Sequence, residues 1–262
     1  MFLIDSHTHL YLEQFNPDRK QVVESAIKQG VEYMLLPNID KDSTDTMLAL
    51  YREFPDNCLP MMGLHPTSVN DDYQEELIRV ENFLSSYSFV AVGEIGIDLY
   101  WDKSFKEQQE DAFRQQLKLA KKFTLPVSIH TRESFDEIYR IVKEEHTKEL
   151  TGVFHCFTGT VEQAKKIMEL GFFMGIGGIV TFKNSGLDRI VKSIPLNFLL
   201  LETDSPFLSP EPYRGKRNQS AYLTFIAQKL AEIKQKPFET IAENTSNNAL
   251  KLFHLNRKQR NG

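Results

Sequence analysis

Eight short apolar segments recur along this chain, and each is followed by a longer stretch in which apolar residues return at helical spacing. Such alternation is typical of repeated βα units whose strands pair in parallel. Eight units in 262 residues fit an α/β fold, a (β/α)8 TIM barrel of roughly 250 residues. The predicted strands are residues 2–5, 33–37, 59–64, 89–94, 126–130, 152–155, 172–176 and 198–202.

Helical patterns fill the intervals between these strands. The clearest covers residues 105–123, where Phe113, Leu117 and Ala120 recur among polar residues. An additional C-terminal helix, over residues 237–253, should close the bottom or side of the barrel. Other helices are expected to start near Pro17, Asp42, Asp71, Glu133, Thr160, Gly186 and Ser220.

Local signals mark several helix ends. Pro17 has the fixed φ of a first helical residue, and Thr160 with Gln163 resembles a capping box. Gly30 and Gly171 are placed as C-terminal caps. No repeat or linker divides the chain, so we expect one domain over residues 1–262, with a loose basic tail over about 256–262.

Composition limits the class of protein. With 41% hydrophobic and 26% charged residues, the chain can bury a sizeable core and is not a candidate for disorder. The first ten residues do not resemble a signal peptide, and no apolar run is long enough to cross a bilayer. We therefore expect a cytoplasmic protein without a membrane partner, in which Cys58 and Cys156 stay free thiols.

The formal net charge of −5 argues against a broad basic surface that holds nucleic acid. Any contact with DNA must then be local. An acidic protein can still offer a cationic pocket where metal ions are bound, because such ions are the largest local charges in a site.

Six ionisable residues lie at or just after the ends of predicted strands. In a barrel these ends converge on one mouth, where active sites sit, so residues far apart in sequence become neighbours. His7 and His9 share a face if the backbone curls after the first strand. The six residues are His7, His9, Glu94, His130, His155 and Asp204.

Four imidazoles and two carboxylates clustered without partners would be costly to bury. A metal is the natural partner: nitrogen and oxygen donors suit zinc, manganese or magnesium, and their number suits two divalent ions bridged by Glu94. Any one histidine alone could equally be a hydrogen-bonded structural residue, and we keep that interpretation for His146 and His254.

The chain resembles the TatD family of metal-dependent deoxyribonucleases, within the amidohydrolase superfamily. The resemblance spans nearly the whole chain, and the order and spacing of its motifs are far more specific than the opening His-x-His. The motifs are IDSHTHL, GLHP (63–66), VGEIGID (92–98), PVSIHTRES (126–134), VFHCFTG (153–159), GIGG (175–178), LLLETDSPFL (199–208) and PYRGKRNQ (212–219).

The resemblance implies a TIM barrel with defined ligand sets. One ion would be held by His7, His9, Glu94 and Asp204, and the other by Glu94, His130 and His155. Glu94 and Asp204 are then the catalytic residues, with Asp204 as general base. His65 looks like a substrate-contacting histidine and not a ligand. Relatives with a carbamylated lysine bridge need a lysine at a strand end, and no predicted strand ends in one.

Cationic residues near the mouth are candidates for binding substrate phosphates. These are Arg132, Arg214, Lys216 and Arg217, with Asn218 in the same motif as the last three. For Lys216 and Arg217 a solvated charge run is an equal alternative. Gln219 and Ser220 stand where Glu and Pro are commoner in the family, which affects the positioning of this loop.

Other residues near the mouth have two possible roles. Tyr100, Trp101, Phe157 and Phe182 could stack on unpaired bases, although such aromatic residues more often cap a core. Cys156 is expected to be a packed thiol facing away from His155. Asp98 and Glu202 are expected to orient ligand imidazoles or the loop.

These features predict a metal-dependent deoxyribonuclease that hydrolyses phosphodiester bonds with a two-metal-activated water. The resemblance further implies exonucleolytic action on single-stranded DNA ends, without an obligate protein partner. The alternative is a hydrolase of a small phosphoester, lactone or amide on the same barrel. A catalytically silent barrel would have lost a ligand, and this chain retains every one.

Overall fold

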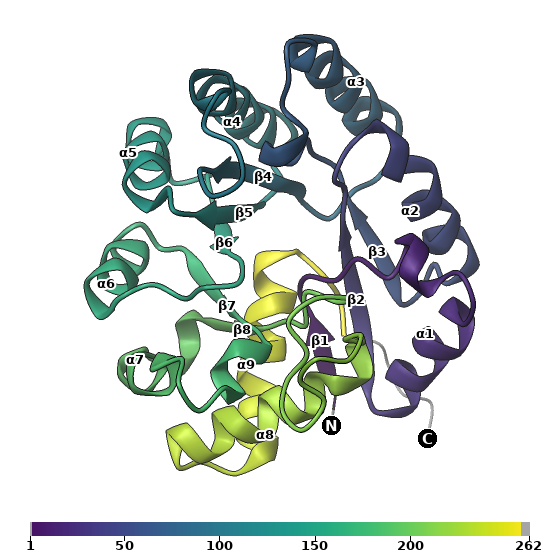
Figure 1. Ribbon diagram of the computed structural model, residues 1–262, viewed down its shortest axis with the longest axis vertical. Helices are drawn as coiled ribbons and strands as arrows, with labels where there is room; N and C mark the ends of the chain where they lie inside the picture. Colours follow the sequence, from purple (N-terminus) through teal and green to yellow (C-terminus); the bar gives the residue numbers. More distant parts are fainter. Residues whose placement is uncertain (1, 258–262) are drawn as a thin grey trace.

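The computed structural model describes residues 2–257, and within them eight strands occupy the interior with helices packed around the outside (Figure 1). Every strand pair is parallel. The strands are β1 (Leu3–Asp5), β2 (Val31–Pro37), β3 (Cys58–Met61), β4 (Val92–Asp98), β5 (Val127–Arg132), β6 (Gly152–Phe154), β7 (Phe173–Ile176) and β8 (Leu199–Leu201).

The strands follow one another in chain order. Two runs, β1-β2-β3 and β4 to β8, are each paired continuously. A parallel bridge between Met62 and Val92 connects β3 to β4. Beyond β1, the Ser6 N–H donates to the Leu201 carbonyl at 3.0 Å, so the first strand meets the last.

Helices follow the strands as the alternating pattern predicts. They are α1 (Arg19–Lys28), α2 (Lys41–Glu53), α3 (Tyr73–Ser86), α4 (Lys106–Phe123), α5 (Phe135–Glu145), α6 (Val161–Glu169), α7 (Leu187–Ser193), α8 (Leu223–Lys234) and α9 (Phe238–Leu252). Short 3-10 helices cover Glu13–Phe15, Pro66–Ser68, Gly178–Thr181, Leu196–Phe198 and Ser220–Tyr222.

The predicted helix ends are confirmed with one exception. Thr160 caps α6 through a reciprocal capping box with Gln163, and Gly30 and Gly171 have the left-handed φ values of 88° and 76° that follow a helix. Pro17 does not open α1, which begins two residues later at Arg19. It lies instead in a turn in which the Asp18 N–H donates to the Phe15 carbonyl, a position that also suits its fixed φ.

Helix α9 covers the amino-terminal ends of the strands, as expected for the additional C-terminal helix. It lies behind the strands in Figure 1, and Ala249 and Leu252 pack against Ile4 and Leu200 from the barrel interior. We call this cluster the bottom plug. Its buried members are Phe2, Ile4, Tyr33, Leu35, Met61, Ala91, Val153, Leu200, Ala249, Leu252 and Phe253.

Two strands continue past their predicted carboxyl-terminal ends. β4 continues four residues past Glu94 to Asp98, and β5 continues past His130 to Arg132. The prediction that Glu94 and His130 end their strands is therefore wrong. The additional residues pair with each other, Ile97 with Thr131 and Asp98 with Arg132, so they extend the sheet at its carboxyl-terminal edge.

Among the described residues, no helix has the length and apolar character required to cross a membrane. Cys58 and Cys156 are not joined by a disulfide, as predicted. The Asn256 carbonyl accepts a hydrogen bond from the Tyr33 hydroxyl at 2.8 Å. This bond fixes the first residue of the tail that the sequence predicts to be loose from about residue 256. Its last part, 258–262, lies outside the described residues.

Candidate metal centre

The six predicted ligands meet at the carboxyl-terminal mouth of the barrel. His7 and His9 follow β1, His155 directly follows β6, and Asp204 comes three residues after β8. Glu94 and His130 extend from within β4 and β5. All six side chains are buried or nearly so. Among the four residues predicted to hold the first ion, which are His7, His9, Glu94 and Asp204, the Asp204 side chain is the most exposed, at 14%.

The Glu94 carboxylate lies at the centre of the cluster. Its Oε2 is 3.1 Å from His7 Nε2 and 3.5 Å from His9 Nε2. Its Oε1 is 2.8 Å from both His130 Nδ1 and His155 Nε2. Each oxygen therefore faces one pair of imidazoles, which is the arrangement expected of a bridging carboxylate.

The backbone around the first histidines curls as predicted. The Thr8 N–H donates to the Leu35 carbonyl, and the His9 N–H donates to the Ser205 carbonyl. The His7 carbonyl in turn accepts from the Asp204 N–H at 2.9 Å. These bonds hold the segment after β1 against the segment after β8, so His7, His9 and Asp204 come from two strands that are nearly 200 residues apart.

Glu94 reaches the mouth from the middle of a strand because the pairing of β4 with β5 is irregular there. The register shifts between Val92 and Ile95, so Glu94 falls within a bulge-like interruption. Such interruptions re-aim a side chain beside an active site.

The hydrogen bonds of the outer imidazole nitrogens determine which nitrogen faces the centre. The Tyr11 hydroxyl donates to the Pro37 carbonyl, so it accepts from His9 Nδ1, 2.9 Å away. Asp98 Oδ2 lies 2.9 Å from His130 Nε2. His9 Nε2 and His130 Nδ1 are consequently unprotonated, and their lone pairs point into the cluster.

Ser128 and Tyr11 support ligands but were not found from the sequence. Ser128 Oγ lies 3.2 Å from His7 Nδ1, and Tyr11 is buried with 1% exposure. For Tyr11 a signal existed, because a tyrosine two residues after His9 on the same curled segment is placed to reach its ring. For Ser128 no local signal existed, since it lies 121 residues from His7.

Glu202 is fully buried beside His155. Its Oε1 accepts from the Cys156 N–H and lies 3.6 Å from His155 Nδ1, which is an ion-pairing distance and too long for a hydrogen bond. A Cβ at Gly175 would overlap the Glu202 carboxylate, so glycine is required there. The expectation that Asp98 and Glu202 accompany ligand imidazoles agrees with these positions.

His65 stands next to the cluster with a different proton arrangement. Its Nε2 is 3.3 Å from Glu94 Oε1. The Thr67 N–H donates to its Nδ1 at 3.1 Å, so the neutral ring carries its proton on Nε2. This nitrogen can donate to an oxygen of Glu94 or of a substrate, as the predicted contact role requires.

Mutual electrostatics shift the pKa values of the cluster. Burial alone would raise the pKa of Glu94, but His155, His65 and His7 hold it well below its usual range. Burial would lower the pKa of His155, yet Glu94 and Glu202 raise it well above its ordinary value. Burial raises the pKa of Asp204 to about 6; a bound cation would oppose that shift.

The donor set fits divalent cations. His7 Nε2 and His9 Nε2 are 3.2 Å apart, and His130 Nδ1 and His155 Nε2 are 3.3 Å apart. Lone pairs and carboxylates facing one another at such distances repel unless a proton or cation lies between them. Three overlapping groups have donor atoms close enough to share an ion: His7, His155 and Asp204; His7, His9 and Glu94; and His65, Glu94 and His130.

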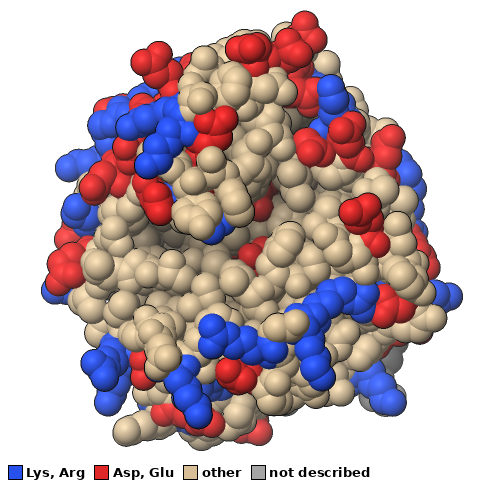
Figure 2. All heavy atoms as spheres, viewed as in Figure 1, with Lys and Arg blue, Asp and Glu red and all other residues tan. Residues whose placement is uncertain are grey.

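A cavity of about 620 Å³ opens above the cluster. Its floor includes His9, Glu94, His130, His155 and Asp204, and its walls carry apolar side chains such as Ile39, Ile179, Phe207 and Leu208. Figure 2 shows this hollow face with uncharged walls, acidic atoms at depth and lysine or arginine side chains along its lower rim. The centre is thus reached from one open face.

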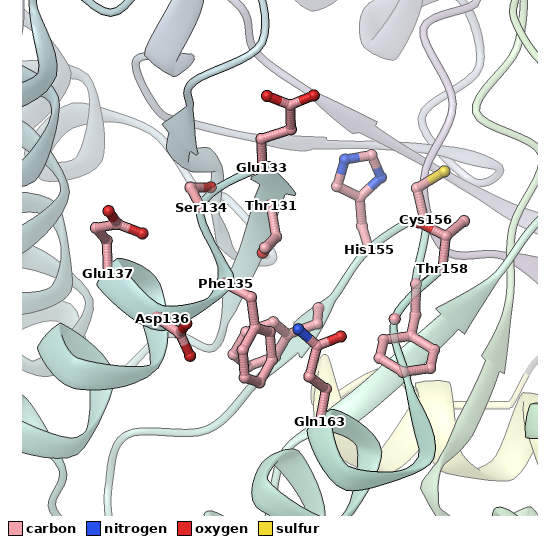
Figure 3. A pocket seen from close by; sticks show the side chains of 13 residues that line it. Thr131, Glu133, Ser134, Phe135, Asp136, Glu137, His155, Cys156, Thr158 and Gln163 are labelled. Atoms are coloured by element: carbon pink, nitrogen blue, oxygen red, sulfur yellow. The ribbon is translucent and has the colours of Figure 1, made fainter.

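A smaller cavity of about 370 Å³ adjoins it between the starts of α5 and α6. In Figure 3, His155 and Cys156 lie on one side of it, Glu133 and Ser134 lie across from them, and Gln163 lies below. Cys156 lines both cavities. Its left-handed φ of 48° breaks the strand alternation from which we expect it to face away from His155. Burial raises the pKa of its thiol well above the usual value.

The residues Arg132, Arg214, Lys216 and Asn218, predicted to contact the substrate, fall into two groups, which are three cationic residues and one buried asparagine. Arg132 lines the cavity, and Arg214 lies with its guanidinium 4.4 Å from the centre of the Phe182 ring. Lys216 lies 5.8 Å from the centre of the Tyr213 ring. Asn218 is fully buried, and its amide donates to the Thr203 and Phe207 carbonyls, so it holds the loop that carries Asp204.

Other predicted residues near the mouth serve packing. Arg217 forms two hydrogen bonds with Asp18 and covers the Phe15 ring, so its charge is paired within the protein. Phe157 is buried. His146 and His254 are exposed and lie outside the cluster, as expected.

Comparison with known proteins agrees with this site. The chain matches the family described as TatD related DNase over residues 4–254. It is 39% identical to an uncharacterized metal-dependent hydrolase, YabD, of Bacillus subtilis (strain 168), across 97% of this chain and 100% of that protein. It is 36% identical to another, YcfH, of Escherichia coli (strain K12), with 97% of each chain covered. The crystal structure of YjjV, a TatD homolog from Escherichia coli K12, superposes with a TM-score of 0.91 at 30% identity, covering 97% of this chain and 98% of that one.

A barrel whose mouth gathers imidazoles and carboxylates at the floor of a cavity defines a metal-dependent hydrolase. The chain belongs to the TatD-related DNase family. The predicted family and the predicted (β/α)8 TIM-barrel fold are both confirmed.

Proposed function

We propose that this protein is a deoxyribonuclease that hydrolyses phosphodiester bonds at single-stranded DNA ends with two divalent metal ions. The observation that carries the proposal is the Glu94 carboxylate, each of whose oxygens faces a separate pair of imidazoles. One ion would be held by His7, His9, Glu94 and Asp204, and the other by Glu94, His130 and His155.

Two cations held in this way would lower the pKa of water and stabilise the negative charge that develops on phosphate oxygens. The protein's own groups supply position and proton transfer. Asp204 faces the cavity and lies 3.7 Å from His9 Nε2, so we assign its carboxylate as the general base for the attacking water. His65, with its proton on Nε2, is placed to donate to a phosphate oxygen.

The rim supports a phosphodiester substrate. Arg132, Arg214 and Lys216 contact aromatic rings, and no carboxylate lies within ion-pairing distance of any of them among residues 2–257. Their charges are therefore available for anionic oxygens. Because the net charge is −5, this local rim and the bound cations would have to attract the nucleic acid.

Cavity size supports action at an end. About 620 Å³ falls within the range that encloses a drug-sized ligand, which is the size of a terminal nucleotide and not of a duplex. The same volume would fit a small phosphoester, lactone or amide, the alternative substrates on this barrel. Cys58 and Cys156 are not joined by a disulfide, which supports a reducing, cytoplasmic location as part of the proposal.

The proposal is tested by hydrolysis of an end-labelled single-stranded oligonucleotide by the purified protein. The protein is first chelated and then supplied with Mg²⁺, Mn²⁺ or Zn²⁺. We expect metal-dependent shortening from one end, and a loss of turnover on the order of 10² to 10⁴-fold in Asp204→Asn. Near-normal activity in that variant would remove Asp204 from the mechanism.

A second outcome would redirect the assignment. If the protein binds metal but shortens no oligonucleotide with any of the three ions, the nuclease proposal fails. Hydrolysis of a small phosphoester, lactone or amide by the same metal-loaded protein would then identify the alternative.

A further inference from the structure

An exposed aromatic pair stands beside the larger cavity. Tyr100 and Trp101 lie in the loop between β4 and α4, with 50% and 70% of their surfaces exposed. Their ring centres are 5.0 Å apart and nearly perpendicular. Trp101 also lines the cavity above the metal centre. The pair therefore presents flat apolar surface next to the site without belonging to the core.

Arg132 completes this surface. Its guanidinium carbon lies 3.9 Å from the centre of the Tyr100 ring and 5.2 Å from that of Trp101. No carboxylate pairs with it in the part of the chain that the structure describes, so its charge is satisfied by the rings and by solvent. We call Tyr100, Trp101 and Arg132 the aromatic corner.

Asp98 fixes the aromatic corner relative to the metal centre. Its Oδ2 lies 2.9 Å from His130 Nε2. Its Oδ1 accepts from the Tyr100 N–H at 2.9 Å and the Trp101 N–H at 3.3 Å. Asp98 is 2% exposed, so one buried carboxylate sets both the orientation of a ligand imidazole and the position of the exposed rings.

We propose that the aromatic corner is a stacking subsite for one unpaired nucleobase, whose phosphate is directed toward the metal centre. The proposal rests on the proposed deoxyribonuclease function. Aromatic rings and arginine planes bind base faces whatever the sequence, and the cation favours the adjoining phosphate. A base within a duplex has its faces covered by its neighbours, so the subsite selects single-stranded ends.

The chain carries its own probe for this subsite, because Trp101 is its single tryptophan. We would measure tryptophan fluorescence of the full-length protein on titration with a phosphorothioate-linked single-stranded oligothymidylate, which reports binding without turnover. The same strand with an abasic residue at each end tests the base. Affinities of Trp101→Ala, Trp101→Phe and Tyr87→Ala would be compared by fluorescence anisotropy of a labelled strand. Tyr87 is a matched control, an aromatic residue 51% exposed that directly follows α3, outside the cavity lining.

We expect oligothymidylate to change the tryptophan emission and Trp101→Ala to weaken its binding about 5- to 150-fold, equivalent to roughly 1–3 kcal/mol. Trp101→Phe should retain most of the affinity, and Tyr87→Ala all of it. The abasic strand should bind wild type and Trp101→Ala equally. Because Trp101 is 70% exposed, these variants should keep the wild-type melting temperature.

Two contrary results have different meanings. If wild type cleaves oligonucleotides while Trp101→Ala binds them within twofold of wild type, the stacking subsite is refuted and the nuclease function stands. If wild type neither binds nor cleaves oligonucleotides, both proposals fail.

Discussion

The two ends of the barrel are built on the same strands from opposite kinds of side chain. On β6, Val153 belongs to the bottom plug, and two residues later His155 belongs to the metal centre. Around β8, Leu200 lies in the plug and Glu202 lies beside His155. Alternate residues of a strand share a face. The inward-facing side chains of these strands therefore change from apolar to polar between one inward-facing residue and the next.

This difference separates stability from chemistry. The bottom plug removes apolar surface from water and should contribute to the free energy of folding. The mouth gathers polar groups that are costly to bury, and only a cation or a proton relieves the repulsion among them. Substitutions in the mouth should therefore change activity with little effect on folding, and substitutions in the plug should do the reverse.

The largest effect is expected from Glu94→Gln. This change keeps the size of the side chain but replaces one acceptor oxygen with an NH2 donor and removes the charge that faces both imidazole pairs. We expect kcat/KM to fall by a factor on the order of 10³ or more, with a nearly unchanged melting temperature in chelator. Glu239→Gln, at the exposed start of α9, is the control at the other end of the barrel and should be fully active.

Leu252→Ala should show the opposite pattern. Leu252 is 4% exposed in the bottom plug, and truncation of such a side chain costs about 2–5 kcal/mol. The free energy of unfolding, measured in urea, should fall by this amount while kcat per folded molecule stays unchanged. Lys251→Ala, on the exposed face of the same helix, controls for helix propensity. Loss of activity without loss of stability in Leu252→Ala would break the division between the two ends.

Tyr11→Phe should have an intermediate effect, which is a weaker affinity of the mouth for metal. The variant removes only the hydroxyl that accepts from His9 Nδ1, so His9 can adopt either tautomer. Loss of such a partner typically weakens metal affinity about 10- to 100-fold. Competition with a fluorescent chelator measures this affinity. An unchanged affinity would show that the Tyr11 hydroxyl does not orient His9.

The smallest effect is expected on the outer layer, far from both ends. Burial alone would raise the pKa of Glu145, but hydrogen bonds from Lys121 and Arg114 lower it. A lowered pKa means that the interaction stabilises the fold above the unfolded pKa of Glu, about 4.3, and that this stability is lost as the pH falls through the folded pKa.

Glu145→Gln should accordingly lower the free energy of unfolding by about 0.5–1 kcal/mol at pH 7, with the difference from wild type vanishing in acid. Denaturant melts between neutral and acidic pH measure this. Glu169→Gln, an exposed residue of α6, should show no such pH-dependent difference. A difference that persists in acid would mean that packing, and not charge, is responsible.

Much of the fold and the ligand set could be predicted because both follow from local pattern. The βα alternation gives the order of elements, and the strand-end rule brings His7, His155 and Asp204 together. The position of Glu94 within β4 could not be predicted, because it depends on the register between β4 and β5. The pairing of Arg217 with Asp18, 199 residues away, and the burial of Asn218 likewise depend on long-range contacts that no local pattern contains.

We propose that two metal ions, bridged by Glu94, bind in the mouth. Metal content by mass spectrometry tests this proposal, after loading purified protein with Zn²⁺ or Mn²⁺ and removing the excess. We predict about two ions per chain for wild type and fewer for Glu94→Gln. About one ion or fewer per wild-type chain, or two ions retained by Glu94→Gln, would contradict this proposal.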